Sequence, residues 1–296
     1  ATSCHTAVML RHAAPPRCNA KPHCHEATPC CATRWRAVRD HDGNLYFVGM
    51  GMVTPYALGL SMALPNRKVI AFDGDGGILF DLSILGTIAQ TAPSNLCVVI
   101  LDNEGYISTG KGKHTASLSS SVIDIAGIAR SSGIKNVYEV KTVDEFENAV
   151  RGGVEDETGP TVIIAKINNE QAFVGTSLMD GKENKYRFVR HIEETENKII
   201  LKPSAREHGE PPQPDPVFSP ISEDDSFGDT LFDSLQENMV NFVVGLPCSG
   251  FANTIRRCME AQSMQYVPVA NEGAGVGICA GVWLGGLTPA AIMENL

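Results

Sequence analysis

The stretch 68–103, KVIAFDGDGGILFDLSILGTIAQTAPSNLCVVILDN, decides the fold. Its two apolar runs, 69–72 and 96–101, have the length of strands, and between them a glycine-rich turn leads into apolar residues at helical spacing. The pattern predicts strand, turn, helix, strand. Parallel strands joined by a helix end at the same edge of a sheet, where ligands bind in open α/β folds. We therefore expect Asp75 and Asn103 to lie close together.

The turn 73–77 combines glycines with carboxylates. Glycines let backbone N–H groups approach a ligand, and the start of a helix favours an anion. A carboxylate there would repel a phosphate unless a divalent cation lay between them, and Asp75 and Asn103 offer the hard oxygens that Mg²⁺ or Ca²⁺ prefers. The plain alternative is an acidic turn with no ligand. An EF-hand loop fails because its twelfth position is Ile84, and a Walker A loop fails because no Gly-Lys-Ser/Thr follows.

The spacing GDG, 25 residues, then Asp102-Asn103 resembles the metal and diphosphate motif of thiamine-diphosphate enzymes. The wording GLSMALPNRKVIAFDGDGG and LDNEGYISTG is similar to the diphosphate-binding half of the sulfopyruvate and phosphonopyruvate decarboxylases. That family usually has two Asn where this chain has Asp102-Asn103. The resemblance implies thiamine diphosphate and a bridging Mg²⁺. Its implied metal ligands are Asp75, Asn103 and the carbonyl of Gly105, and the residues facing the diphosphate are Gly74, Gly76 and Gly77.

Two further segments belong to this resemblance. The turn Gly49, Met50 and Gly51 follows an expected strand at 45–48, and the family's turn there contacts the cofactor's aminopyrimidine. The loop 104–114 carries the implied substrate-binding cations Lys111, Lys113 and His114, which suit a dianionic phosphonate or sulfonate. The alternatives are a strand-to-helix turn with a core Met and two solvated lysines. The family usually has Gly-Gln where this chain has Lys111-Gly112, so the substrate is left open.

Alternating strands and helices continue to about residue 167, which predicts an α/β fold with a doubly wound parallel sheet in a domain at 37–200. The proline-rich, acidic segment 201–226 is expected to be a linker. A second, incomplete α/β domain is expected at 227–296. Residues 1–36 contain five of the nine cysteines but no CxxC pair, so a disordered or misassigned leader is favoured over a zinc site.

The second domain resembles the start of the family's pyrimidine-binding domain, through a Gly-x-Pro turn and the motif Asn271-Glu272-Gly273. The resemblance makes Glu272 the catalytic carboxylic acid, which hydrogen-bonds the pyrimidine ring and must be desolvated to exchange a proton. The plain alternative is a Glu that complements the helix dipole. Small residues around Gly277 and Gly281 predict close helix packing. The order of the halves suggests a β-type chain fused to the start of an α-type chain.

The bulk properties narrow the choice of partners. A net charge of −10 argues against nucleic acid, and no apolar run approaches the length of a membrane span. The scattered later cysteines suit a reducing cytoplasm.

The function that the resemblance implies is decarboxylation of a 2-oxo acid with thiamine diphosphate and Mg²⁺, in a homo- or hetero-oligomer that shares the site between chains. The alternatives are a non-catalytic or partner-dependent cofactor-binding subunit and another Mg²⁺–phosphate enzyme on the same fold.

Overall fold

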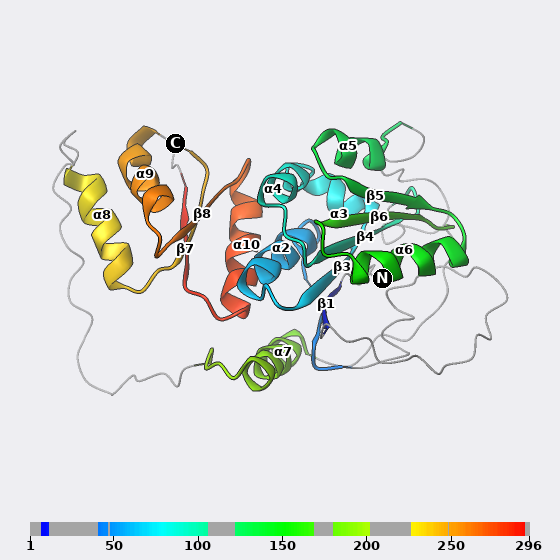
Figure 1. The fold of residues 1–296 in the computed structure, drawn as a ribbon, viewed down its shortest axis with the longest axis horizontal. Helices are drawn as coiled ribbons and strands as arrows, with labels where there is room; N and C mark the ends of the chain where they lie inside the picture. Colours follow the sequence, from blue (N-terminus) through cyan, green and yellow to red (C-terminus); the bar gives the residue numbers. More distant parts are fainter. Residues whose placement is uncertain are drawn as a thin grey trace.

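Two sheets with flanking helices make up the computed structural model, which describes residues 7–11, 41–46, 48–105, 122–168, 180–201, 226–247 and 249–293 (Figure 1). The larger sheet has the strand order β2-β1-β3-β4-β6-β5, and the smaller one has the order β8-β7-β9. The strands of the larger sheet are β1 (Ala7–Arg11), β2 (Asn44–Tyr46), β3 (Lys68–Gly74), β4 (Leu96–Asp102), β5 (Asn136–Val140) and β6 (Thr161–Lys166). Those of the smaller sheet are β7 (Phe242–Gly245), β8 (Gln265–Pro268) and β9 (Pro289–Ile292). The predicted α/β class is confirmed.

The larger sheet is covered on both faces, as expected of a doubly wound fold. Side chains of β3, β4 and β6 alternate between two apolar clusters, with Val98 and Ile100 in one and Cys97 and Val99 in the other. Helix α6 (Val143–Glu155) packs in the second cluster through Phe146 and its neighbours. The first cluster takes in α2 (Val53–Ala63), α4 (Ile84–Thr91), α5 (Ile125–Ser131) and α7 (Gly181–Glu196). A strand buried on both faces must be apolar throughout, which explains the continuous runs in the sequence.

Strand β1 was not expected. The sequence assigned residues 1–36 to a leader outside the folded domain, yet Ala7–Arg11 pairs antiparallel with both β2 and β3, and Val8 is fully buried. That part of the prediction was wrong, because partners distant in the chain stabilise a short strand whose own sequence carries little signal. The rest of that segment, including all its cysteines, lies outside the described residues. Because β1 is antiparallel to both of its neighbours, β2 is parallel to β3 and is separated from it by β1.

A second difference is a break in the helix that follows β3. The sequence predicted one helix between the turn and the second strand, whereas α3 (Asp75–Phe80) ends at Asp81 and α4 starts at Ile84. Asp81 leaves the helical region with φ −143° and ψ 67°, and its carboxylate accepts a hydrogen bond of 2.6 Å from the Ser83 hydroxyl. Short polar side chains of this kind compete with helical backbone bonds, so they end helices locally.

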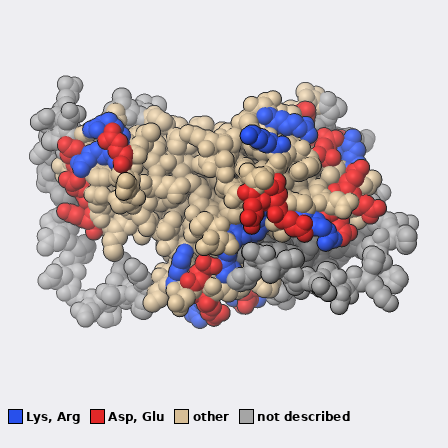
Figure 2. Space-filling view, in the orientation of Figure 1, with Lys and Arg blue, Asp and Glu red and all other residues tan. Residues whose placement is uncertain are grey.

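The smaller sheet carries α8 (Ser226–Glu237), α9 (Ala252–Glu260) and α10 (Glu272–Leu284). Helix α10 lies between this sheet and α2 (Figure 1), so residues of both sheets share one apolar cluster. The surface over α10 and the adjacent strands forms a band without charged side chains in the view of Figure 2. No described helix is both long enough and apolar enough to cross a membrane.

Candidate functional site

The candidate metal ligands lie at the carboxyl ends of two adjacent parallel strands. Gly74, the last residue of β3, is in register with Leu101 of β4. The next residue of β3's chain is Asp75, and Asn103 follows Leu101 by two positions. Both side chains are nearly inaccessible, with relative exposures of 3% for Asp75 and 5% for Asn103. The topology thus brings together two buried hard-oxygen side chains that are distant in the sequence.

Asp73, which the sequence alone did not indicate as a site residue, holds the glycine turn in place through hydrogen bonds to its carboxylate. Its carboxylate accepts hydrogen bonds of 2.9 Å from the Thr54 hydroxyl and 2.9 Å from the Gly74 N–H. Burial raises the pKa of Asp73 to about 6, although these two hydrogen bonds oppose the rise and the charge of Asp75 adds to it. A polar residue inside an otherwise apolar strand was the signal in the sequence, because buried carboxylates need dedicated partners.

The glycines of the turn serve different purposes. A Cβ atom placed on Gly77 would lie 2.1 Å from Oδ1 of Asp73, so this position is glycine because the carboxylate fills the space. A Cβ atom on Gly74 would meet nothing within 4 Å, which leaves that side of the turn open. Gly76 is buried within α3. Of the three predicted diphosphate-facing glycines, Gly77 is thus explained by contacts inside the protein, and Gly74 has open space beside it.

The second strand end is a tight turn held by its own side chains. Asn103 Oδ1 accepts a hydrogen bond of 3.0 Å from the Gly105 N–H, which brings the predicted third ligand beside the second. Glu104 between them has φ +58°, an unusual conformation that often marks functional turns. Asp102 accepts a 2.6 Å hydrogen bond from Nζ of Lys166. Burial lowers the pKa of Lys166, but the hydrogen bond and charge of Asp102 outweigh it and raise that pKa overall.

The turn Gly49–Met50–Gly51 lies against α3. Gly51 has φ +79°, and a Cβ atom there would lie 2.9 Å from Cβ of Phe80 and 3.8 Å from the carbonyl oxygen of Gly77. The two turns assigned to the cofactor are therefore neighbours. Met50 is 52% exposed, so the alternative of a core methionine is wrong. Lys111, Lys113 and His114 lie outside the described residues.

Glu272 is the first residue of α10 and is exposed to solvent. The burial expected for it is not present in this chain. The preceding residue, Asn271, caps the helix by accepting a 2.7 Å bond from the Ala274 N–H. Its amide nitrogen donates to Asp81 Oδ1 at 2.7 Å and to Ser83 Oγ at 2.9 Å.

These bonds join the start of α10 to the break between α3 and α4, a connection for which the sequence alone assigned Asn271, Asp81 and Ser83 no role. The Asp81-x-Ser83 interruption of an apolar helix was the available signal. The other oxygen of Asp81, Oδ2, is buried without a hydrogen-bond partner in the described part of the chain. A buried carboxylate oxygen without a hydrogen-bond partner lowers the stability of the fold.

Comparisons with known proteins agree with this geometry. The family model "Thiamine pyrophosphate enzyme, C-terminal TPP binding domain" matches residues 27–165. The sulfopyruvate decarboxylase subunit beta of Methanococcus maripaludis is 31% identical over 156 residues, covering 52% of this chain and 80% of that protein. The phosphonopyruvate decarboxylase of Streptomyces hygroscopicus is 38% identical over 125 residues, covering 42% of this chain but 30% of that protein.

Two further matches are to an alpha subunit and to a solved structure. The sulfopyruvate decarboxylase subunit alpha of Methanococcus maripaludis is 28% identical over 67 residues, covering 23% of this chain and 40% of that protein. A transketolase from Leishmania mexicana matches the fold with a TM-score of 0.53 at 12% identity, covering 83% of this chain and 48% of that one. Residues 1–201 alone are too few to make up 83% of this chain, so the similarity in fold includes part of the second domain.

The matched domain and the fold define the class of protein, a thiamine pyrophosphate enzyme built on parallel α/β sheets. The sequence relatives narrow this class. The chain belongs to the family of thiamine-diphosphate-dependent decarboxylases that includes the sulfopyruvate and phosphonopyruvate decarboxylases.

Proposed function

We propose that the chain catalyses the non-oxidative decarboxylation of a 2-oxo acid, such as sulfopyruvate or phosphonopyruvate, with thiamine diphosphate and Mg²⁺. The observation that carries this proposal is the pair of buried oxygen side chains, Asp75 and Asn103, at the ends of adjacent parallel strands. The names of the relatives support the substrate class. We also propose that the protein forms a homo- or hetero-oligomer.

The donor set fits a small hard cation. Asp75 offers a carboxylate, Asn103 an amide oxygen and Gly105 a backbone carbonyl, and Mg²⁺ takes oxygen ligands of these kinds. Asn103 Oδ1 accepts one hydrogen bond from Gly105, which leaves its second lone pair for a metal. Asp102, where the family has Asn, is paired with Lys166 and is left out of the proposed ligand set.

The chain's own residues would bind and orient the cofactor. Asp75, Asn103 and the Gly105 carbonyl would hold the metal, and the turn 49–51, which lies against α3, would contact the cofactor. Thiamine diphosphate, when bound, supplies the electron sink for the loss of CO₂. Glu272 holds a proton for exchange with the pyrimidine ring, a role for which a carboxyl needs to be desolvated. Lys111, Lys113 and His114 attract the sulfonate or phosphonate.

Calorimetric titration with thiamine diphosphate, with and without Mg²⁺, tests the cofactor assignment. We expect saturable binding that requires the metal and weakens by more than about 10-fold in Asp75→Ala. Asp144→Ala removes an exposed carboxylate in the first turn of α6 and is the matched control, with unchanged binding. Binding that ignores the metal, or an unaltered Asp75→Ala, would overturn the assignment. Release of CO₂ from sulfopyruvate or phosphonopyruvate, lost in Glu272→Gln, tests the activity.

A partner-dependent role is the second candidate. The chain covers 80% of a subunit named beta, and Glu272 is exposed in the chain on its own. The smaller sheet has three strands in the described residues, which supports an incomplete pyrimidine-binding half. The assay compares CO₂ release with and without an added α-type chain. Release by the chain alone would exclude this candidate.

The described cysteines support a reducing compartment such as the cytoplasm. Cys97, Cys258 and Cys279 are free thiols, and two of them are buried.

A further inference from the structure

The two halves meet where α10 packs on α2, and glycines of each helix lie directly against the backbone of the other. A Cβ atom placed on Gly281 of α10 would lie 2.1 Å from the carbonyl oxygen of Tyr56, and one on Gly59 of α2 would lie 2.1 Å from the carbonyl oxygen of Ile278. Both helices thus contribute a glycine against the other's backbone. Such an approach requires glycine on both surfaces, so α2 and α10 are complementary to each other in shape.

The pairing also fixes the direction of α10. Gly277 lies against Pro55, and Gly285 lies against Ala63, with Cβ positions 2.5 Å and 2.3 Å from those side chains. Residue numbers rise together along both helices, so the helices are parallel and both start at the same end. The start of α2 follows the turn 49–51, and the start of α10 is Glu272. The parallel packing of the two helices therefore places Glu272 at the end of α2 that follows the turn 49–51.

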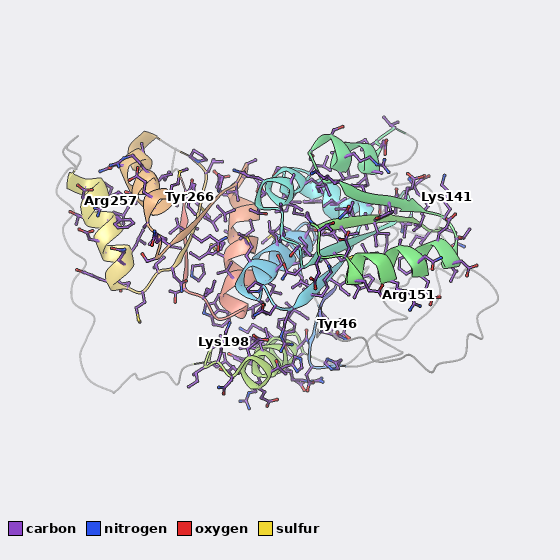
Figure 3. All side chains as sticks on the ribbon, in the orientation of Figure 1. Tyr46, Lys141, Arg151, Lys198, Arg257 and Tyr266 are labelled. Atoms are coloured by element: carbon purple, nitrogen blue, oxygen red, sulfur yellow. The ribbon has the colours of Figure 1, made fainter. Side chains whose placement is uncertain are left out.

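The face of α2 that α10 covers is not available to another chain. Nine of the eleven residues of α2 are buried, between the larger sheet on one side and α10 on the other. After α7, Ile200 contacts Gly286 at the far end of α10, at 3.1 Å from its Cβ position, and Figure 3 shows Lys198 beneath the same region. Both ends of α10 are thus engaged by residues that precede the linker.

We propose that the segment 227–293 supplies the Glu272 side of the cofactor site to its own chain in cis, and that it occupies the α2 surface on which a separate α-type chain would otherwise dock. The proposal rests on the proposed function for the identity of the site, but the docking itself does not. Its rival is exchange between two copies, in which each segment packs on the other copy's α2 through the same contacts. The 24 residues at 202–225 span at most about 80 Å when extended, so the length of the linker does not exclude either arrangement.

A cross-link at the polar junction separates these arrangements without any assay of activity. Ser83 Oγ and Asn271 Nδ2 lie 2.9 Å apart, so the double variant Ser83→Cys/Asn271→Cys places two thiols within reach of oxidation or of a short bis-maleimide. We expect a peptide joining positions 83 and 271 in a species of 31.7 kDa on denaturing gels. The two single variants control for the native cysteines.

The outcomes are decisive in each direction. The joined peptide in a covalent dimer would overturn the proposal in favour of exchange between copies. Absence of the joined peptide, from a double variant whose circular dichroism matches that of the wild type, would overturn the docking altogether. Neither result depends on whether the chain binds thiamine diphosphate, so failure of this inference and failure of the proposed function are distinguishable.

Mixing of two inactive variants gives a second test. Asp75→Ala removes a proposed metal ligand and Glu272→Gln removes the proposed acid, so a cis site has one defect in every chain when the two are unfolded together and refolded. We expect activity no higher than the sum of the separate variants. Exchange between copies would instead restore about a quarter of the wild-type activity, since half of randomly formed dimers hold one intact site of two.

Discussion

Replacing Gly281 with alanine tests the helix contact on which the arrangement of the two halves depends. In an isolated helix this change would be favourable by about 1 kcal/mol, because alanine is the better helix former. In the protein the new Cβ would lie 2.1 Å from the Tyr56 carbonyl oxygen and 2.9 Å from the Leu60 nitrogen. Both are backbone atoms of α2, so no side chain can rotate away, and the helices must separate by about 1 Å to reach ordinary contact.

That separation weakens every contact across the pair. A radial gap of about 0.5 to 1 Å forfeits a quarter to a half of the dispersion energy of each atom pair. Added volume in a well-packed core costs about 1 to 3 kcal/mol. We therefore expect Gly281→Ala to lower the free energy of unfolding by about 2 kcal/mol, the helix propensity having been partly regained.

Urea unfolding followed by tryptophan fluorescence measures the loss. The chain has two tryptophans, and in a Trp35→Phe background the signal comes from Trp283, which lies on α10 itself and is 40% exposed. Gly152→Ala on α6 is the matched control, because a Cβ atom there meets nothing within 4 Å. The free energy of unfolding of this control variant should rise by up to about 1 kcal/mol. Equal stability of the two alanine variants would refute the packing of α10 on α2.

Three further predictions concern single residues. Asn184 on α7 accepts a 2.6 Å hydrogen bond from the Tyr46 N–H of β2 and donates a 2.9 Å hydrogen bond to the Asn44 carbonyl of the same strand. Loss of these two buried hydrogen bonds in Asn184→Ala should lower the free energy of unfolding in urea by about 1 to 3 kcal/mol, and a loss below about 0.5 kcal/mol would contradict this. Asp102→Asn should lower stability by about 1 to 2 kcal/mol through loss of the Lys166 pair, while calorimetry should show the Mg²⁺ requirement unaltered; loss of that requirement would make Asp102 a ligand. Burial raises the pKa of Cys97 to about 12 from 9.0, so the unfolded chain ionises first as pH rises and stability is lost between these values. Between about pH 8 and pH 10 the wild type should lose about 1.4 kcal/mol more than Cys97→Ala, and parallel pH profiles would refute the burial of this thiol.

The strand–turn–helix–strand unit could be predicted because its information is local. The runs 69–72 and 96–101 became β3 and β4 with small changes at their ends, since strands covered on both faces have no polar positions to blur the pattern. The same unit fixed the positions of Asp75 and Asn103 at one sheet edge. To place those two residues, the only non-local assumption needed was that the two strands pair in parallel.

What the sequence could not supply was the identity of distant partners. Strand β1 pairs with β2 and β3, and the five residues of β1 contain no signal that identifies these two strands as its partners. Close packing around Gly277 and Gly281 was predicted correctly, but not that α2, more than 200 positions earlier, is the helix against which they pack. Figure 3 likewise shows Tyr46 where α7 meets β2, a contact across 138 positions in which the side-chain oxygen of Asn184 accepts a hydrogen bond from the Tyr46 N–H.

The polar junction has a role that the glycine contact alone could not fill. Gly277, Gly281 and Gly285 are four residues apart, so a slide of α10 by four residues, about 6 Å, would again set small residues against α2. The apolar contact therefore leaves the position of Glu272 along the axis weakly determined. Asn271 removes that freedom, because its two hydrogen bonds to Asp81 and Ser83 form in one register alone. A bond to a charged acceptor is worth about 1.5 to 3 kcal/mol, enough to populate that register by more than tenfold. The helix break at Asp81, which looks like a defect when α3 and α4 are considered by themselves, is thus what sets the place of the proposed catalytic acid.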